Sequence, residues 1–524
     1  MISVKDPLTG STIRWSSHPQ ALGYTMPLSA AVNERSAGRR WAVPEHPDCA
    51  VLFDGKICVA SAGWDAISMQ LRRFDAATLA FVDMLQIGQF GTGAHYVENR
   101  QIPTAHRIPQ VAATASNLYF IANGGLQGAQ NTYYLRRLAA GSSAFVSPTN
   151  LDVTKADHWV GAAVPTVGGS ALTSSYYYGC RVIRRPAGAE RVLIPALWNT
   201  ADGKAHAAVA YSDDLYTKGN SQAALWTFAP VVNGDRANNA VMGHLAAYSN
   251  EDGSASMLVG VVTQLYCMNY LNVVYSEDGG TTWKVAGVDE ADYDVPVGGL
   301  VCDHAELVAR RLMNDTNKTF SVQRVVYDAV AQKAYVSLLI ATGRGYLNGR
   351  PTSDDAACYI LEIDLSARAT TGCTQTLHGP FLASPLRNFA NGIQLIDEDA
   401  NNLLGIVAMP VAAVNPGPGY IDCPDGGPTL NVYRIPKATV GTFATWTLVQ
   451  TIGLPAGGSP YPYRDAVVEN IIHEWGYGDG QIFNGVVPVD GRSDVVAALV
   501  GDQRVTGAHQ CYHMGRLVLL EVGS

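Results

Sequence analysis

Length, composition and charge exclude several classes of protein. The chain has 524 residues, of which 47% are hydrophobic and 15% charged, with 52 glycines and 26 prolines; this composition is typical of a globular, turn-rich protein and not of a disordered one. The net charge of -9 argues against electrostatic binding to nucleic acid or to anionic lipid. No apolar run approaches the roughly 20 residues of a membrane helix, and no basic-then-apolar export signal opens the chain, so we expect neither membrane insertion nor Sec-type export.

The predicted elements are almost all β-strands, because helical periodicity is nearly absent. Residues 49–63 contain two apolar runs around an Asp54-Gly55 turn, and residues 69–82 form a second hairpin that turns at Asp75–Thr78. Short apolar or alternating runs then recur to the C-terminus, at residues 107–140, 191–228, 254–287, 321–365, 391–450 and 480–523. These make about seven four-stranded units at intervals of roughly 60–90 residues.

So many successive meanders favour an arrangement of separate sheets around a central axis, because one open sheet of that size is hard to stabilise. The sequence therefore predicts an all-β fold, a β-propeller of six or seven four-stranded blades, over residues 49–524. We expect residues 1–48 to be an extended attachment segment and residues 140–178 a loop-rich insertion. A multi-domain β-sandwich protein is the alternative, although no linker rich in proline, serine or charge divides the chain.

The nine cysteines form no CxxC pair, and most lie in apolar strand-like runs, as Cys58 and Cys267 do. Cysteine packs as a small hydrophobic residue, and an odd count fits poorly with a full disulfide framework. We therefore expect buried free thiols.

One turn carries a specific motif. The stretch SEDGGTTW follows an apolar strand and has the pattern S-x-D-x-G-x-T-W, with Ser276, Asp278, Gly280, Thr282 and Trp283 at the defining positions. Short polar side chains satisfy turn backbone, glycine permits a positive φ, and tryptophan supplies an apolar plug. The stretch resembles the Asp box of sialidases and related bacterial neuraminidase repeats, and the resemblance implies a structural turn on a propeller blade. Weaker echoes run from Ser212 to Trp226 and from Tyr433 to Trp446.

The resemblance to sialidases extends loosely over about residues 100–430. HRIPQV is similar to the aromatic-Arg-Ile-Pro motif of the family, with Arg107 as the matching arginine, and residues 391–410 resemble a strand pair of these enzymes. A sialidase requires three arginines that bind a carboxylate, an acid/base Asp and a Tyr–Glu pair. However, residues 122–140, where the acid is expected, contain no Asp or Glu.

The remaining candidate ligand-binding residues follow no motif. Arg387 and Arg464 are candidates for further carboxylate-binding arginines, as is Arg181, because the guanidinium group pairs bidentately with carboxylates. Tyr463 accompanies Arg464 in YPYRDAVVEN, which also reads as a polar loop between blades. The second YRIP, at Tyr433–Pro436, belongs to an outer hairpin and receives no role in a site.

Three other clusters have a structural interpretation beside a functional one. His509, Cys511 and His513 share one face of a strand as zinc ligands would, but no fourth ligand lies nearby. Asp397–Asn402 imitates the start of a calcium loop but lacks its later glycine and glutamate, which favours a hairpin turn. Tyr176–Tyr178 either pack a blade edge or stack on sugar rings. We therefore predict no metal and no cofactor.

The sequence supports two hypotheses for the function, and they belong to different classes of protein. The first is a glycan-recognising propeller, a tail-fibre or spike component of a bacteriophage virion that binds a cell-surface glycan as receptor, with other virion proteins as further partners and a homo-oligomer left open. The bacteriophage assignment is implied only by resemblance to Asp-box propellers of phage tails. The second is an exo-acting glycoside hydrolase of sialidase type, so the sequence leaves enzymatic activity open. We expect location in the virion after synthesis in the host cytoplasm, with a cytoplasmic protein as the alternative.

Overall fold

The structure of the chain is a computed structural model. It describes residues 2–5, 12–17, 49–62, 68–89, 110–123, 132–146, 150–152, 166–167, 170–177, 180–200, 205–213, 227–232, 240–264, 270–287, 313–314, 318–342, 346–347, 350–351, 356–370, 372–384, 393–409, 429–453, 481–506 and 510–523. The chain divides into two compact units. Unit 1 comprises residues 1–109, 341–358 and 380–524, and unit 2 comprises residues 110–340 and 359–379.

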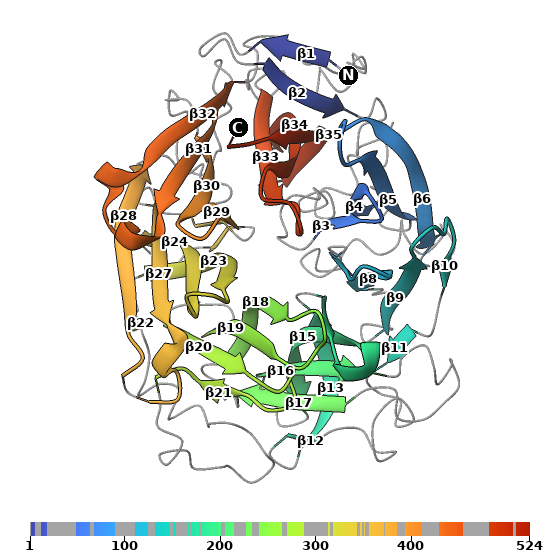
Figure 1. The fold of residues 1–524 in the computed structure, drawn as a ribbon, viewed down its shortest axis with the longest axis vertical. Coiled ribbons are helices and arrows are strands. Elements are labelled where there is room, and N and C mark those ends of the chain that lie inside the picture. Colours follow the sequence, from blue (N-terminus) through green and yellow to red (C-terminus); the bar gives the residue numbers. More distant parts are fainter. Residues whose placement is uncertain are drawn as a thin grey trace. The chain divides into compact units, whose positions relative to one another are not determined.

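Unit 1 contains three large antiparallel sheets (Figure 1). The first has the order β3 (Ala50–Phe53), β4 (Lys56–Ala62), β5 (Ser68–Asp75), β6 (Phe81–Gln89). The second has the order β29 (Gln394–Asp397), β30 (Asn402–Met409), β31 (Thr429–Pro436), β32 (Thr447–Gly453). In the third, β33 (Gln481–Pro488), β34 (Val495–Thr506) and β35 (Gln510–Glu521) are followed by β2 (Thr12–Ser17) and β1 (Ile2–Lys5). A small sheet joins β25 (Tyr346–Leu347) to β26 (Arg350–Pro351).

Unit 2 contains the other large sheets. One has β7 (Gln110–Ala113), β8 (Asn117–Asn123), β9 (Thr132–Ala139) and β10 (Phe145–Val146), with β11 (Asn150–Asp152) on β9. The next has β12 (Thr166–Val167), β13 (Ser170–Tyr177), β15 (Glu190–Thr200), β16 (Ala205–Ser212) and β17 (Thr227–Val232), with β14 (Arg181–Arg184) on β15. A third has β18 (Ala240–Ser249), β19 (Ser256–Gln264), β20 (Tyr270–Ser276) and β21 (Lys284–Val285), with β22 (Met313–Asn314) on β20. The sheet β23 (Lys318–Asp328), β24 (Lys333–Thr342), β27 (Ala356–Asp364), β28 (Gln375–Ser384) lies mainly in unit 2.

The described strands thus form seven large antiparallel sheets of at least four strands each. The strands mostly follow one another in meander order, except that β2 supplies the fourth strand beside β35. The fold is an all-β propeller with seven blades, which confirms the predicted fold class and selects seven blades from the predicted six or seven. Helical structure in the described part of the chain consists of four one-turn 3-10 helices, at Pro186–Gly188, Leu365–Ala367, Lys437–Thr439 and Phe443–Thr445. Among the same residues, no helix has the length and hydrophobicity needed to cross a membrane.

Both predicted N-terminal hairpins are present. Asp54 and Gly55 have φ angles of 50° and 67°, the left-handed pair that a two-residue hairpin turn requires, and β5 turns into β6 after Asp75. The predicted boundary at residue 48 remains a prediction, but β2 pairs with β35, with Trp15 opposite Leu520 (Figure 1). Within the predicted insertion 140–178, the structure has the short strands β10, β11 and β12 and the longer β13.

The hydrophobic core lies between facing sheets within each unit. In unit 2, one cluster joins β14–β17 to β18–β21 through Leu193, Leu258 and Trp283, and another joins β18–β20 to β23–β27. In unit 1, Leu404 and Leu520 belong to a cluster shared by the sheets of β29–β32 and β33–β35. Apolar residues on both faces of the strands explain the nearly continuous hydrophobic runs of the sequence.

Candidate functional site

The turn from Ser276 to Trp283, between β20 and β21, is held together by its own side chains. The Ser276 hydroxyl accepts a hydrogen bond from the Gly280 amide at 2.8 Å and donates one to Asp278 Oδ1 at 2.8 Å. Asp278 Oδ1 also accepts from the amides of Thr281, at 3.0 Å, and Thr282, at 2.9 Å, and Oδ2 accepts from the Thr282 hydroxyl at 2.7 Å. The turn therefore satisfies backbone groups that no strand ladder reaches.

Trp283 anchors this turn in the core of unit 2. Its side chain is 1% exposed and its indole N–H donates to the Gly280 carbonyl at 3.2 Å. Gly280 has a φ of +87°, and a Cβ atom at this position would lie 2.8 Å from Leu193 Cδ2 of the neighbouring sheet. Only glycine fits both the conformation and the space.

Arg191 joins this turn to the neighbouring sheet. Its Nη1 donates to the Gly279 carbonyl and the Thr281 hydroxyl, both at 2.9 Å, while Nε and Nη2 bind the two carboxylate oxygens of Asp213 at 2.7 Å. The guanidinium group is buried and lies 4.2 Å from the Tyr211 ring centroid. A bidentate, buried arginine of this kind fixes the geometry of its neighbours, so the turn is part of the scaffold.

The electrostatics of Asp278 agree with that role. Burial acts to raise the pKa of Asp278, but the hydrogen bonds from Thr282, Ser276 and Thr281 outweigh it and leave the pKa of this carboxyl below its ordinary value. The carboxylate is thus held ionised as a hydrogen-bond acceptor. An acid catalyst needs the opposite shift.

The same chemistry recurs in other sheets at the turn from the third to the fourth strand. Asp75 Oδ1 accepts from the amides of Ala77 and Thr78 and from the Thr78 hydroxyl at 2.8 Å. Asp364 Oδ1 accepts from the Ser366 amide at 3.0 Å and its hydroxyl at 2.6 Å. These hydrogen bonds hold the pKa of each Asp below its ordinary value.

The turn at Asp75–Thr78 was predicted as the turn of the second hairpin, but its likeness to the Ser276–Trp283 turn was missed, and the turn at Asp364 was not predicted. An Asp directly after an apolar strand, followed by Ser or Thr two or three residues later, is the signal that both share. Of the two echoes that were predicted, Asp213 binds Arg191, whereas Trp226 lies outside the described residues. In the other, the Trp446 indole donates to the Val440 carbonyl at 3.1 Å.

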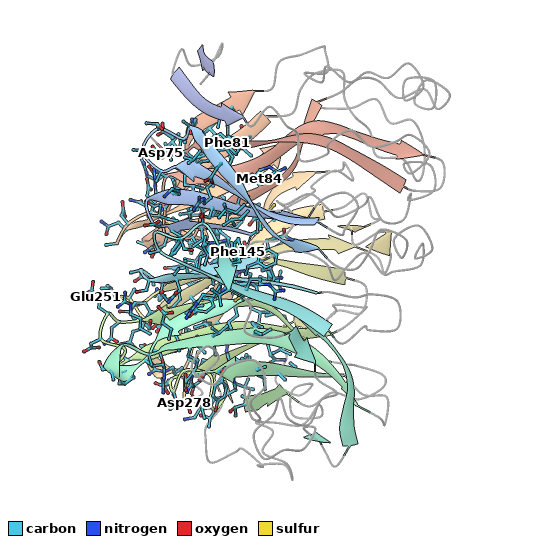
Figure 2. The ribbon with its side chains drawn as sticks, turned by 90° about the vertical axis from the view of Figure 1, so that its right-hand side faces the viewer. Asp75, Phe81, Met84, Phe145, Glu251 and Asp278 are labelled. Atoms are coloured by element: carbon cyan, nitrogen blue, oxygen red, sulfur yellow. The ribbon has the colours of Figure 1, made fainter. Side chains whose placement is uncertain are left out.

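Within each unit, these turns lie at one end of the strands. This follows because the first-to-second and third-to-fourth connections of an antiparallel meander lie at the same end of the strands. Figure 2 shows Glu251 and Asp278, from two turns of unit 2, at the same end of the strands. In unit 1, Arg492 donates to the Ala76 carbonyl at 2.7 Å, and Arg434 binds both Glu398 and the Gly523 carbonyl. We call this end of the strands in each unit the turn edge.

All four predicted ligand-binding residues lie outside the described residues. The chain nevertheless places them in one type of connection, from the fourth strand of one sheet to the first strand of the next. Arg107 falls between β6 and β7, Arg387 between β28 and β29, and Arg464 with Tyr463 between β32 and β33. In an antiparallel meander, the fourth strand of one sheet ends, and the first strand of the next begins, at the end of the strands opposite the turn edge.

Arg181, the further candidate arginine, is buried and engaged within unit 2. Its Nε donates to the Leu245 carbonyl at 2.6 Å, its Nη1 donates to the Cys180 carbonyl at 3.0 Å, and its Nη2 lies 3.1 Å from His244 Nε2. All three nitrogens thus contact protein groups, so Arg181 holds strands together and does not take part in a carboxylate site.

A partly exposed charged row crosses the sheet of β23–β28. Glu362 accepts from the Lys333 ammonium at 2.6 Å and lies 2.9 Å from His378 Nε2. Burial acts to raise the pKa of Glu362, but its hydrogen bonds to Lys333 and His378 outweigh it and lower the pKa. The row is a cross-strand ion pair of the kind that stabilises sheets.

No group of three metal-ligating side chains comes together among the described residues. The Asp397–Asn402 stretch is a hairpin turn, as predicted, in which Asp399 accepts from the amides of Asn401 and Asn402. Cys511 and His513 lie in β35, while their side chains and the whole of His509 fall outside the described part. The predicted thiols Cys58 and Cys358 are free and buried, and burial raises the pKa of both to about 12.

Comparison with known proteins gives likenesses of fold only. No family model and no curated protein sequence matches the chain. Among solved structures, hydrazine synthase of Kuenenia stuttgartiensis is similar with a TM-score of 0.43 and 10% identity, covering 88% of this chain and 93% of that one. The Hadza microbial sialidase Hz136 has a TM-score of 0.38 and 13% identity over 87% and 73% of the two chains. The NanB sialidase of Streptococcus pneumoniae has a TM-score of 0.38 and 10% identity over 95% and 73%.

Proposed function

We propose that this protein is a glycan-recognising β-propeller that binds its ligand at the edge opposite the turn edge, through Arg107, Arg387, Arg464 and Tyr463. The observation that carries the proposal is the place of the three arginines in the chain. Each lies in a connection from the fourth strand of one sheet to the first strand of the next. Loops of one kind on a rigid sheet scaffold are where binding residues concentrate.

The residue types suit an acidic sugar. Guanidinium groups bind a carboxylate with paired, charge-assisted hydrogen bonds, and a tyrosine ring packs against the apolar face of a pyranose while its hydroxyl remains available for hydrogen bonding. The ligand class we propose is therefore a cell-surface glycan that carries a carboxylated sugar.

The turn edge supports the proposal by contrast. Many of its described polar side chains are engaged within the protein, as in the hydrogen bonds of Asp278 and the ion pairs of Arg191 and Arg434. A ligand there would have to compete with these internal contacts, at a cost of about 1–3 kcal/mol for each buried polar group left without a partner.

We further propose that the protein acts in a bacteriophage virion, as a tail-fibre or spike component that binds the host receptor alongside other virion proteins. This assignment depends on the resemblance of the Ser276–Trp283 turn to Asp-box propellers of phage tails. Location of the chain in purified virions tests it directly, and absence from them would remove it.

A glycan array tests ligand recognition. Wild type should bind glycans with a carboxylated terminal sugar, and Arg107→Ala and Arg464→Ala should each weaken binding at least tenfold. Lys56→Ala, which removes a positive charge from the turn edge where Lys56 lies 3.6 Å from Asp54, serves as the control and should bind as wild type does. Equal binding by all four proteins would overturn the assignment of the arginines.

A fluorogenic sialoside assay separates binding from hydrolysis. Turnover by wild type that Arg107→Ala abolishes would identify a sialidase-type hydrolase in place of a binding protein. We expect no turnover by either protein, since residues 122–140 lack the acid that the sialidase reaction needs.

A further inference from the structure

Tyr248 and Tyr327 bring two phenol rings together between neighbouring sheets of unit 2. Tyr248 lies in β18 and Tyr327 in β23, and their ring centroids are 6.1 Å apart with an interplanar angle of 64°. In this edge-to-face arrangement, the carbon atoms at the edge of one ring point at the other ring. Two tyrosines from different sheets are therefore in direct ring contact.

The strand ends that carry the two rings are held in place. Tyr327 is half-buried and packs against the core cluster that joins β18–β20 to β23–β27. The Asp328 carboxylate that follows it accepts hydrogen bonds from two amides of its own turn. On the other strand, the hydroxyl of Ser249, the residue after Tyr248, accepts from the Arg184 amide at 3.0 Å. The fold thus keeps the rings near each other, which favours any reaction between them.

The pair can be reached from solvent. Tyr248 is 40% exposed, so an oxidant dissolved in water has access to its ring. Burial raises the pKa of Tyr327 above its ordinary value of 10.0, although the positive charge of Arg368 acts in the opposite direction. Tyr327 is therefore a neutral phenol at neutral pH, and its oxidation removes an electron together with the hydroxyl proton.

We propose that Tyr248 and Tyr327 form a site of oxidative modification, at which a one-electron oxidant couples the two rings into a dityrosine cross-link. The contact between the rings carries the proposal, because coupling requires two phenol rings that meet before either radical reacts elsewhere. The exposed Tyr248 gives the oxidant its entry, and the packed Tyr327 supplies the fixed partner.

The reaction balances in two steps. Hydrogen peroxide, activated by a haem peroxidase, takes one electron and one proton from each of the two phenol hydroxyls and is reduced to two molecules of water. The two phenoxyl radicals then form one carbon–carbon bond between the ring carbons next to each phenol oxygen. The hydrogen on each of those carbons leaves as a proton, and each phenol oxygen takes up one proton from water, which restores both aromatic rings.

The cross-link joins two sheets of unit 2 covalently. Tyr248 and Tyr327 lie in the first strands of successive sheets and are far apart in the sequence. A covalent bond between such residues restricts the unfolded chain and so favours the folded state. Oxidation at this pair therefore makes it harder for β18 and β23 to separate.

Oxidation of the full chain with hydrogen peroxide and a haem peroxidase, followed by mass spectrometry of the digested protein, tests the proposal. Because the chain has 25 tyrosines, the measurement is the identity of the cross-linked peptides and not the total dityrosine fluorescence. A peptide pair that joins Tyr248 to Tyr327 should form in the folded protein. Its yield should fall at least tenfold when the chain is oxidised in urea, where the fold no longer holds the rings together.

Two further measurements make the result decisive. In an equal mixture of unlabelled and ¹⁵N-labelled chains, both peptides of the pair should come from the same chain. Hydrogen exchange of β18 and β23 peptides should be at least tenfold slower after oxidation of wild type, whereas Tyr248→Phe, which keeps the ring but lacks the hydroxyl, should show no such change. Tyr433→Phe, whose ring contacts Phe443 and Trp446 of unit 1, serves as the control and should respond as wild type does.

Three outcomes would overturn the proposal. The first is a folded chain that is oxidised at other tyrosines without the pair of Tyr248 and Tyr327. The second is a yield of that pair as high in urea as in the folded protein. The third is a pair whose two peptides come from different chains.

Discussion

Replacement of Asp278 by alanine tests the structural role of the Ser276–Trp283 turn. The Asp278 carboxylate accepts four hydrogen bonds, two from backbone amides and two from hydroxyl groups. A hydrogen bond to a charged group contributes about 1.5–3 kcal/mol when buried. Here water reaches part of the site and replaces some of the lost contacts, so we expect Asp278→Ala to lower the free energy of unfolding of unit 2 by about 2–3 kcal/mol in total.

Urea denaturation followed by tryptophan fluorescence measures this loss, and hydrogen exchange of peptides from β20 and β21 assigns it to unit 2. Asp278→Asn keeps one oxygen acceptor but not the charge, and should lose about half as much. Glu251→Ala, at an exposed position in the neighbouring turn of unit 2 (Figure 2), serves as the control and should stay within about 0.5 kcal/mol of wild type.

The pH dependence of the free energy of unfolding of the same proteins gives a second test. Because the pKa of Asp278 is lowered in the fold, its contribution is present above the ordinary value of 3.8 and is lost as the pH falls through the lowered value. The stabilities of wild type and Asp278→Ala should therefore converge below about pH 4. An Asp278→Ala protein as stable as wild type at neutral pH, or one that folds fully yet no longer binds glycan, would refute the reasoning.

Three other substitutions or treatments have expected outcomes. Gly280→Ala forces a side chain into a φ of +87° and to 2.8 Å from Leu193, so urea unfolding should show a loss of about 2 kcal/mol or more; a loss below about 0.5 kcal/mol would contradict the close approach. Cys58 and Cys358, buried thiols with pKa values raised to about 12, should resist alkylation by iodoacetamide at pH 7 and react after unfolding, as mass spectrometry of labelled peptides will detect; rapid labelling of the folded chain would argue against their burial. Glu190→Ala removes the acceptor shared by three side chains of the β7–β8 hairpin, and hydrogen exchange should show faster opening of that hairpin alone, whereas unchanged exchange would mean that the contacts contribute nothing.

Local chemistry made much of the fold predictable. Asp54-Gly55 between two apolar runs is sufficient to specify a hairpin, and the run from Ser276 to Trp283 specifies a turn that its own side chains hold. The count of meanders predicts the number of blades to within one. In each case the residues that determine the structure are close neighbours in the sequence.

Contacts between distant residues were not predictable. Arg191 binds the Gly279 carbonyl across 88 residues, and its sequence neighbours carry no sign of that partner. The pairing of Trp15 with Leu520 joins the two ends of the chain, and neither strand specifies the other by pattern. His244 of β18 contacts Val325 of β23 and Arg181 of β14, and a single histidine in an apolar strand gave no sign of either partner.

The residues of the candidate site show the same difference between local contacts, which could be predicted, and contacts with distant residues, which could not. The turn at Asp278 could be assigned to the scaffold from its sequence, and its hydrogen bonds agree with that role. Arg181 was an open candidate for ligand binding because burial cannot be read from a lone arginine, and the structure gives it a place in the core. Arg107, Arg387 and Arg464 share a position in the meander, which only the strand order made visible.

Binding of wild type, Arg107→Ala and Asp278→Ala to an array of carboxylated and neutral glycans tests the central claim most directly. The claim predicts that wild type and the folded fraction of Asp278→Ala bind the same carboxylated glycans, while Arg107→Ala binds at least tenfold more weakly. Full binding by Arg107→Ala together with loss of binding by folded Asp278→Ala would place recognition at the turn edge and contradict the claim.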